Sequence, residues 1–79
     1  MKINLVKRIK GYAALSRMIA ELGIEPFCEA KEIDTPTGFP VTPYCYTGNK
    51  TQFYKGKDGK FFAYPEVSHK TFEVYELAI

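Results

Sequence analysis

Four of the five prolines fall within one short stretch, between Pro26 and Pro43. A proline inside a helix removes a backbone hydrogen bond and costs about 3 kcal/mol, so this stretch cannot hold a long helix. Any long helix must precede Pro26, and the residues after Pro43 must supply most of the remaining structure. The two regions differ accordingly, because apolar residues recur every three or four positions in residues 4–23, whereas aromatic and β-branched residues dominate the C-terminal half.

Residues 4–23 have the pattern of an amphipathic helix. Gly23 stands where a helix C-cap belongs, shortly before a proline that prevents continuation. Gly11 is the weak point, because a glycine inside a helix costs about 1 kcal/mol relative to alanine. It leaves open a second interpretation, in which residues 2–9 form a short strand and the helix covers only residues 12–22. We expect the longer helix.

The C-terminal half is typical of an antiparallel sheet. Asp58-Gly59 is the favoured pair for a two-residue type I′ turn, so we expect a β-hairpin around it. A short strand is expected over residues 27–33, and residues 69–79 favour a last strand, with a terminal helix as the alternative. The sequence therefore predicts one α+β domain spanning residues 1–79, with an N-terminal helix packed on a three- or four-stranded antiparallel sheet in the order α-β-β-β-β.

A chain of 79 residues buries only about 60% of its unfolded surface, which leaves little room for a deep catalytic pocket. Motifs that carry chemistry are missing as well. His69 is the only histidine, and together with Cys28 and Cys45 it does not supply the ligand number and spacing of a zinc site. The glycines lack the spacing of phosphate-binding and dinucleotide-binding loops. We therefore expect no enzyme, no metal and no cofactor, and we interpret both cysteines as reduced core residues.

The N-terminal residues carry several positive charges without a continuous apolar run, which is unlike a secretory signal. No stretch comes near the roughly 18 apolar residues that a transmembrane helix needs. These two features predict a cytoplasmic protein with no membrane partner.

The net charge of +2 is too small to imply a partner, but the charge is distributed in blocks. Residues 1–20 carry +5, residues 21–34 carry −4, residues 50–60 carry +3 and residues 61–79 carry −2. The plain interpretation is a folded domain whose faces differ in sign. The functional interpretation is a basic face that binds an acidic partner.

Residues 44–64 hold seven of the twelve aromatic residues. If Asp58 and Gly59 are the two central turn residues, one hairpin face mixes three rings with three lysines, and the uncharged other face receives the helix. This mixed hairpin face comprises Phe53, Lys55, Lys57, Lys60, Phe62 and Tyr64. It has three interpretations: lysine stems that lie over rings, rings that stack on single-stranded nucleic acid, or a surface that docks on a protein or on another copy of the chain.

Together these features predict a small non-enzymatic cytosolic interaction protein. The expected contact residues are Lys7, Lys10 and Arg17 on the helix, or the mixed hairpin face. In size and style the chain resembles the small accessory proteins of phages and mobile elements, which implies that it binds and inhibits a host protein or protein complex. The alternative is a single-stranded nucleic-acid-binding protein that uses the mixed hairpin face, and a homodimer through exposed rings is a third expectation.

Overall fold

A computed structural model describes residues 2–25, 29–34, 39 and 50–78 of the chain. Within them, one helix and six strands follow in the order β1 (Lys2–Lys10), α1 (Tyr12–Leu22), β2 (Lys31–Asp34), β3 (Lys50–Lys55), β4 (Phe61–Ala63), β5 (Glu66–Ser68) and β6 (Thr71–Ala78). The strands form an antiparallel sheet in the order β1-β6-β4-β3-β2, and β5 pairs with β6 beside this path. The predicted α+β class is confirmed, but six strands replace the predicted three or four.

The prediction of a helix from residue 4 is wrong, and the alternative with a strand before a shorter helix is confirmed. Gly11 has φ 89° and ψ 152°, a conformation that residues with a side chain rarely adopt, so the helix begins only at Tyr12. The Gly11 N–H donates to the carbonyl oxygen of Lys70 at 2.7 Å, and the Gly11 carbonyl accepts from the Leu15 N–H at 3.1 Å. A single residue therefore ends β1, starts α1 and ties both to the turn before β6.

Strand β1 pairs with β6 along its whole length, from Lys2 opposite Ala78 to Lys10 opposite Thr71. The register shifts between Leu5 and Lys7, which face Tyr75 and Val74, so Val6 has no partner on β6. Such a β-bulge places one extra residue in one strand and interrupts the alternation of faces. Apolar spacing in this segment consequently does not show the simple two-residue period of a strand.

The predicted hairpin exists, but its register is shifted by one residue. Tyr54 pairs with Phe62 and Lys55 with Phe61. The loop has three residues, because the Gly56 N–H donates to the Lys60 carbonyl at 2.8 Å and the Gly59 N–H donates to the Gly56 carbonyl at 3.1 Å. Gly59 takes the positive φ of 85° that such a loop needs at its last position. The Asp-Gly pair thus serves a longer turn than the expected one.

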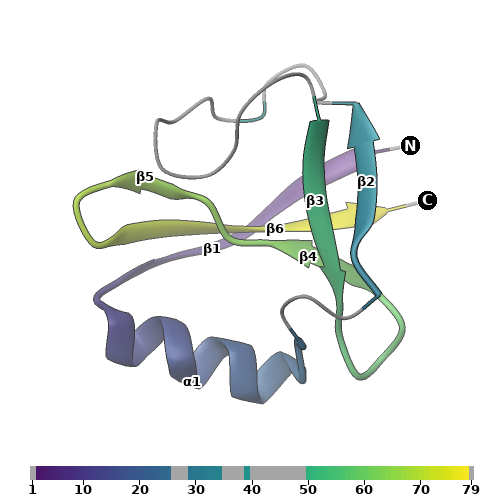
Figure 1. Cartoon of the computed structure of the whole chain (residues 1–79). Helices are drawn as coiled ribbons and strands as arrows, with labels where there is room; N and C mark the ends of the chain where they lie inside the picture. The colour runs from purple at the N-terminus through teal and green to yellow at the C-terminus, as the bar shows by residue number, and fades with distance from the viewer. Residues whose placement is uncertain (1, 26–28, 35–38, 40–49, 79) are drawn as a thin grey trace.

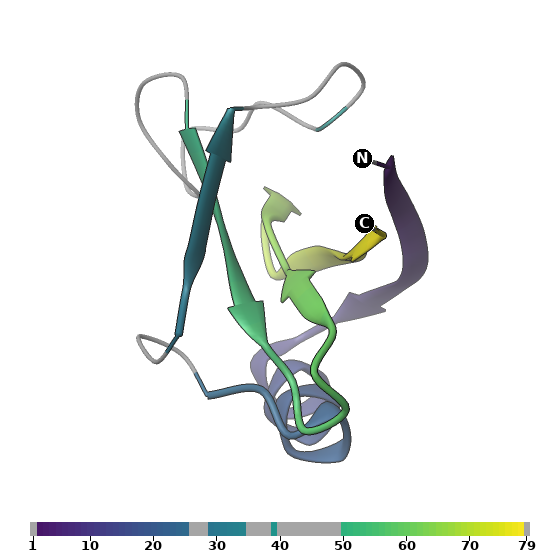
Figure 2. The same ribbon diagram turned by 90° about the vertical axis from the view of Figure 1, so that its right-hand side faces the viewer.

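The sheet is strongly curled, since β2 and β3 run across the direction of β1 and β6 (Figures 1 and 2). One face encloses a first core, and α1 covers the other face over a second core (Figure 1). Both faces are therefore buried, which is the reason why the hairpin is aromatic on both sides. The first core contains Ile33, Phe39, Phe53, Ala63 and Leu77, and the second contains Met18, Ile24, Phe62 and Val74.

The two ends of the predicted sheet have different outcomes. The last segment is a strand, β6, and not a helix. The first predicted strand, over residues 27–33, is observed as β2 at Lys31–Asp34, while residues 26–28 lie outside the described residues. Cys28 and Cys45 also lie outside them, so their predicted role in the core stays a prediction.

Gly56 is a sharp test of how the hairpin docks on the helix. A Cβ atom added there would lie 2.8 Å from the Leu22 carbonyl oxygen and 2.9 Å from Cε2 of Phe62. The same carbonyl accepts a hydrogen bond from the Lys57 N–H at 3.0 Å, so it is not free to move. We expect Gly56→Ala to lower the free energy of unfolding by about 1–3 kcal/mol, as other overpacked sites do.

Urea denaturation followed by circular dichroism measures this change. Ser16→Ala, at an exposed position of α1, is the control and should stay within about 0.5 kcal/mol of wild type. A Gly56→Ala protein as stable as wild type would contradict the close packing of the hairpin on the end of α1.

Candidate functional site

The structure does not bring the mixed hairpin face together on the surface. The side chains of Phe53 and Phe62 are only 0% and 3% exposed, and they lie in separate cores on opposite faces of the sheet. Tyr64 is half-buried against Tyr54 with 5.9 Å between ring centroids, and burial raises the pKa of its hydroxyl. The one-residue shift of the hairpin register is the cause, because it moves alternate side chains to the other face.

Two of the three hairpin lysines are engaged with carboxylates. Lys55 Nζ lies 3.0 Å from Glu29 Oε2, and Lys60 Nζ lies 3.2 Å from Glu76 Oε1. Lys57 is exposed in the loop, where its side chain passes close to Gly23 at the end of α1. The positive block of residues 50–60 is thus largely balanced by acidic residues of other blocks.

The other predicted contact residues are divided between β1 and α1. Lys7 lies on β1 and not on the helix, and its Nζ is 3.9 Å from Glu21 Oε2 of α1. Lys10 ends β1 and Arg17 lies on the exposed face of α1, one turn before Glu21. These three residues belong to one region, because α1 folds back along β1 (Figure 1).

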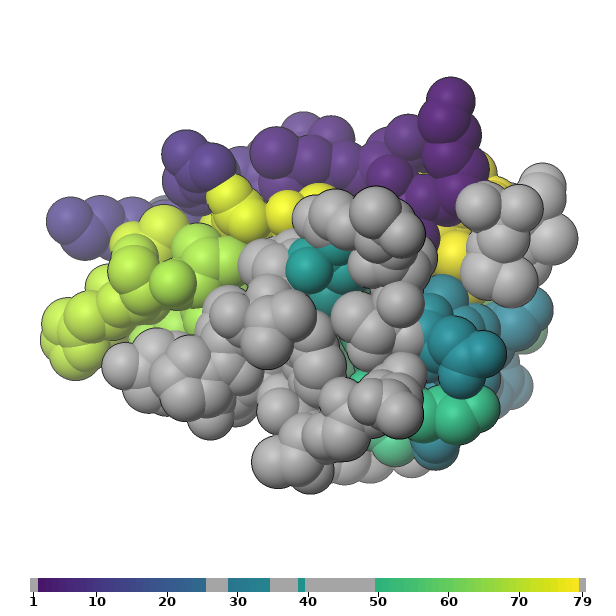
Figure 3. All heavy atoms as spheres, turned by 90° about the horizontal axis from the view of Figure 1, so that it is seen from above, coloured from purple at the N-terminus to yellow at the C-terminus, as the bar shows by residue number. Residues whose placement is uncertain are grey.

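That region contains a feature that the sequence analysis missed, which is the free edge of β1. This strand has nine residues, ends the strand order of the sheet, and pairs only with β6 among the strands that the structure describes. It lies at the margin of the molecule in both Figure 2 and the space-filling view of Figure 3. The backbone N–H and C=O groups on the outer side of such a strand are available to another chain.

The side chains of β1 are basic and apolar. The strand contains Lys2, Lys7, Arg8 and Lys10 and no acidic residue. Leu5 and Val6, in the middle, are 51% and 46% exposed, which is unusual for large apolar residues in a sheet. We call this strand with its outer backbone the β1 edge. The only sequence signal for it was Gly11, which had allowed a strand over residues 2–9.

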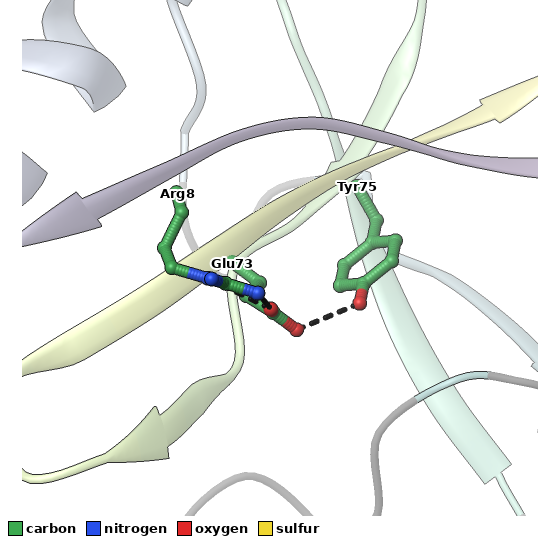
Figure 4. A network of polar contacts seen from close by, with 3 residues as sticks. All are labelled: Arg8, Glu73 and Tyr75. Atoms are coloured by element: carbon green, nitrogen blue, oxygen red, sulfur yellow. Dashed lines mark hydrogen bonds and ion pairs between the residues drawn. The ribbon is translucent and has the colours of Figure 1, made fainter.

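One cation of β1 belongs to a polar network on the sheet (Figure 4). Arg8 donates from Nε to Glu73 Oε2 at 3.0 Å and also from Nη2 to the same oxygen, and the Tyr75 hydroxyl donates to Glu73 Oε1 at 2.8 Å. Glu73 is buried and lies directly opposite Arg8 in the β1–β6 register. Since 65 positions separate the two residues, sequence spacing could not reveal the pair.

The electrostatics of this network are those of a fixed ion pair. The hydrogen bonds from Arg8 and then from Tyr75 hold the pKa of Glu73 below its ordinary value of 4.5. Burial and the hydrogen bond to Glu73 raise the pKa of Tyr75 to about 12. Glu73 therefore stays ionised and Tyr75 stays protonated at neutral pH, so neither is prepared to transfer a proton there. The network fastens β1 to β6.

The described residues contain no group of three or more His, Cys, Asp or Glu side chains that could hold a metal ion. His69 is exposed in the turn between β5 and β6. None of the helices in the described part of the chain is long and apolar enough to cross a membrane.

Comparison with known proteins gave no match: no family model fits the sequence, and no curated protein or solved structure is significantly similar to the chain.

The Glu73 network predicts how stability depends on pH. Because the folded-state pKa of Glu73 is lowered, the unfolded chain binds more protons in acid, so the contribution of the network is present above about pH 4.5 and is lost as the pH falls through the folded value. The raised pKa of Tyr75 acts at the other end, where stability falls as the pH rises from 10.0 to about 12. We expect Glu73→Gln to lower the free energy of unfolding at neutral pH by about 1–3 kcal/mol and to flatten the acid loss.

Urea denaturation at a series of pH values measures both effects. Glu32→Gln removes an exposed carboxylate of β2 and is the matched control, which should keep the acid loss of wild type. The assignment is refuted if Glu73→Gln loses stability in acid as steeply as the control.

Proposed function

We propose that this chain is a non-enzymatic interaction protein that binds a protein partner through the surface formed by the basic strand β1 and the adjoining helix α1. The observation that supports it is the β1 edge: a nine-residue basic strand with exposed Leu5 and Val6 and with no described strand on its outer side. Exposed apolar residues framed by polar ones mark interaction surfaces. Binding by surface contact needs no pocket and no cofactor, which suits a chain of this size.

The proposal keeps part of the predicted contact set and sets aside the rest. Lys7 and Lys10 remain because they belong to β1, and Arg17 remains because it lies on the exposed face of α1. The hairpin residues Phe53 and Phe62 support the fold from within the cores, so they offer no area to a partner. The proposed surface therefore lies around β1 and α1 and not on the hairpin.

A host protein or protein complex is the partner that we propose for this surface. A small domain that covers an acidic patch on a larger protein blocks whatever else uses that patch, and this is how it would inhibit. Opposite charges on the two surfaces would raise the association rate and select the partner. The cytoplasmic location belongs to the same proposal.

Single-stranded nucleic acid is the alternative partner, and one observation favours it. The ring of Tyr12 is 55% exposed and follows Lys10 by two residues, so a ring for stacking lies close to a cation for phosphate. One ring is a small platform, since the phenylalanines that were to supply stacking are buried. For this reason we place the protein partner first.

The test is affinity capture from nuclease-treated lysate of cells that encode the chain, with three purified proteins as bait. Wild type and the control Lys50→Glu/Lys57→Glu should retain the same partner, whereas Lys10→Glu/Arg17→Glu should lose it. Both double variants change the net charge by four units, from +2 to −2, so only the position of the charges differs. Lys50 lies on β3 and Lys57 in the loop after it, beside Gly23 just past the end of α1, so neither residue belongs to β1.

Quantitative mass spectrometry of the retained proteins gives the result. A partner that is lost equally from both double variants would indicate non-specific charge attraction and refute the surface. Fluorescence anisotropy with labelled single-stranded oligonucleotides is the parallel measurement. Salt-sensitive binding that only Lys10→Glu/Arg17→Glu removes would favour the nucleic-acid alternative.

A further inference from the structure

We propose that the β1 edge binds an acidic, extended segment of the partner as an additional β-strand of the sheet. The inference rests on the proposed function and names both the mode of binding and the chemistry of the bound segment. In such strand addition, backbone hydrogen bonds supply affinity and alternate side chains supply specificity.

The two ends of the sheet are not equivalent as docking sites. The β1 edge offers nine residues, which at about 3.3 Å per residue corresponds to roughly 30 Å of strand. The opposite end, β2, has only four residues. Because the backbone bonds gained by strand addition scale with the paired length, β1 is the edge that can hold a peptide.

The positive charge of β1 makes a second copy of the chain an unfavourable occupant of the β1 edge. Each copy has four cations and no acid on β1, and within the described residues only Lys7 and Arg8 lie beside acids of their own copy, so any β1–β1 pairing brings the unpaired Lys2 and Lys10 of both copies onto two neighbouring strands. Like charges opposite one another in a sheet are destabilising. The β2 strand of a second copy has acids at Glu32 and Asp34 but is too short to cover β1, and Asp34 already lies 3.2 Å from Lys50 Nζ. The complementary occupant is an acidic segment of a different protein.

The order of residues along β1 gives the pattern of that segment. Lys2 lies near one end, Leu5 and Val6 lie in the middle, and Lys10 lies at the other end. Lys2 and Lys10 form no ion pair within the described residues, so both are available to carboxylates. A matching segment carries acidic residues at both ends and β-branched apolar residues between them.

The bulge at Val6 is consistent with an edge that binds a different protein and not a copy of itself. It interrupts the pairing of β1 with β6 at one position, between Leu5 and Lys7. Bulges and lysines are devices by which edge strands avoid pairing with copies of themselves. Here they would disfavour self-association while leaving an acidic strand a favourable partner, so the same features that protect the edge also select its ligand.

The probe is a fluorescein-labelled nine-residue peptide with two glutamates at each end and alternating valine and threonine between them. Anisotropy titration should show binding that weakens with salt. Lys2→Glu/Lys10→Glu should weaken it at least about tenfold, and Lys50→Glu/Lys57→Glu should leave it within about twofold. A peptide in which glutamine replaces every glutamate should bind the wild-type protein about as weakly as the parent peptide binds Lys2→Glu/Lys10→Glu.

Backbone methylation separates strand addition from simple charge attraction. Two further peptides carry N-methyl groups on odd or on even residues, which removes the donors of one strand edge at a time and keeps every side chain. We expect one version to lose at least about tenfold in affinity and the other to bind nearly as well as the parent, since only one peptide edge faces β1. Equal binding of all three peptides would overturn strand addition.

The outcomes distinguish this inference from the proposed function. If the captured partner depends on Lys10 and Arg17 but the methylated peptides bind like the parent, the function stands and strand addition is refuted. If no acidic peptide binds at low salt, the inference is likewise refuted, whatever the capture shows. Sedimentation must give a monomer, because a wild-type dimer that Lys2→Glu/Lys10→Glu dissociates would assign the edge to a second copy.

Discussion

The pairing of β6 with three other strands is the interaction on which the rest of the structure depends. It pairs with β1, β4 and β5, and its side chains alternate between the two cores, with Val74 under α1 and Leu77 on the opposite face. The Glu73 network fastens β1 to it, and the Gly11 N–H fastens the start of α1 to the turn before it. Both halves of the chain therefore meet on the last strand, and the N-terminal strand β1 has all of its described backbone pairing with it.

This dependence explains how much of the fold the sequence could predict. Local signals were sufficient for the C-cap at Gly23, for a turn at Asp58-Gly59 and for the last strand, because each rests on the preferences of neighbouring residues. The prediction for the N-terminal segment failed because its strand is stabilised by pairing with β6, some seventy positions away, and the periodicity of the sequence cannot detect such pairing. The predicted register of the hairpin was wrong because an Asp-Gly pair can occur in turns of two lengths. The difference of one residue moves Phe62 from the predicted surface to a core.

The charge blocks of the sequence acquire a meaning in three dimensions. Cations of each basic block approach acids of another block: Lys7 with Glu21, Arg8 with Glu73, Lys50 with Asp34, Lys55 with Glu29 and Lys60 with Glu76. Exposed pairs of this kind add little stability each, and only the Arg8–Glu73 pair combines burial with several hydrogen bonds. Their main effect is to balance Lys50, Lys55 and Lys60 around the hairpin, whereas Lys2 and Lys10 near the ends of β1 and Arg17 of α1 form no ion pair within the described residues. The site could not be predicted because block charges give no indication of which cations are balanced.

An edge strand faces two opposing requirements, since it must resist copies of itself and still be able to bind a ligand. A long apolar edge binds well but aggregates, and a short edge such as β2 is safe but holds little. The β1 strand combines length with four cations and no acidic residue, and the lysines near its two ends make self-pairing costly while they favour acidic strands. Leu5 and Val6 then add apolar contact to a segment whose acidic ends already pair with the lysines of β1. On this strand the lysines would select the ligand and the backbone hydrogen bonds would supply the affinity for it. The two contributions can therefore be measured independently.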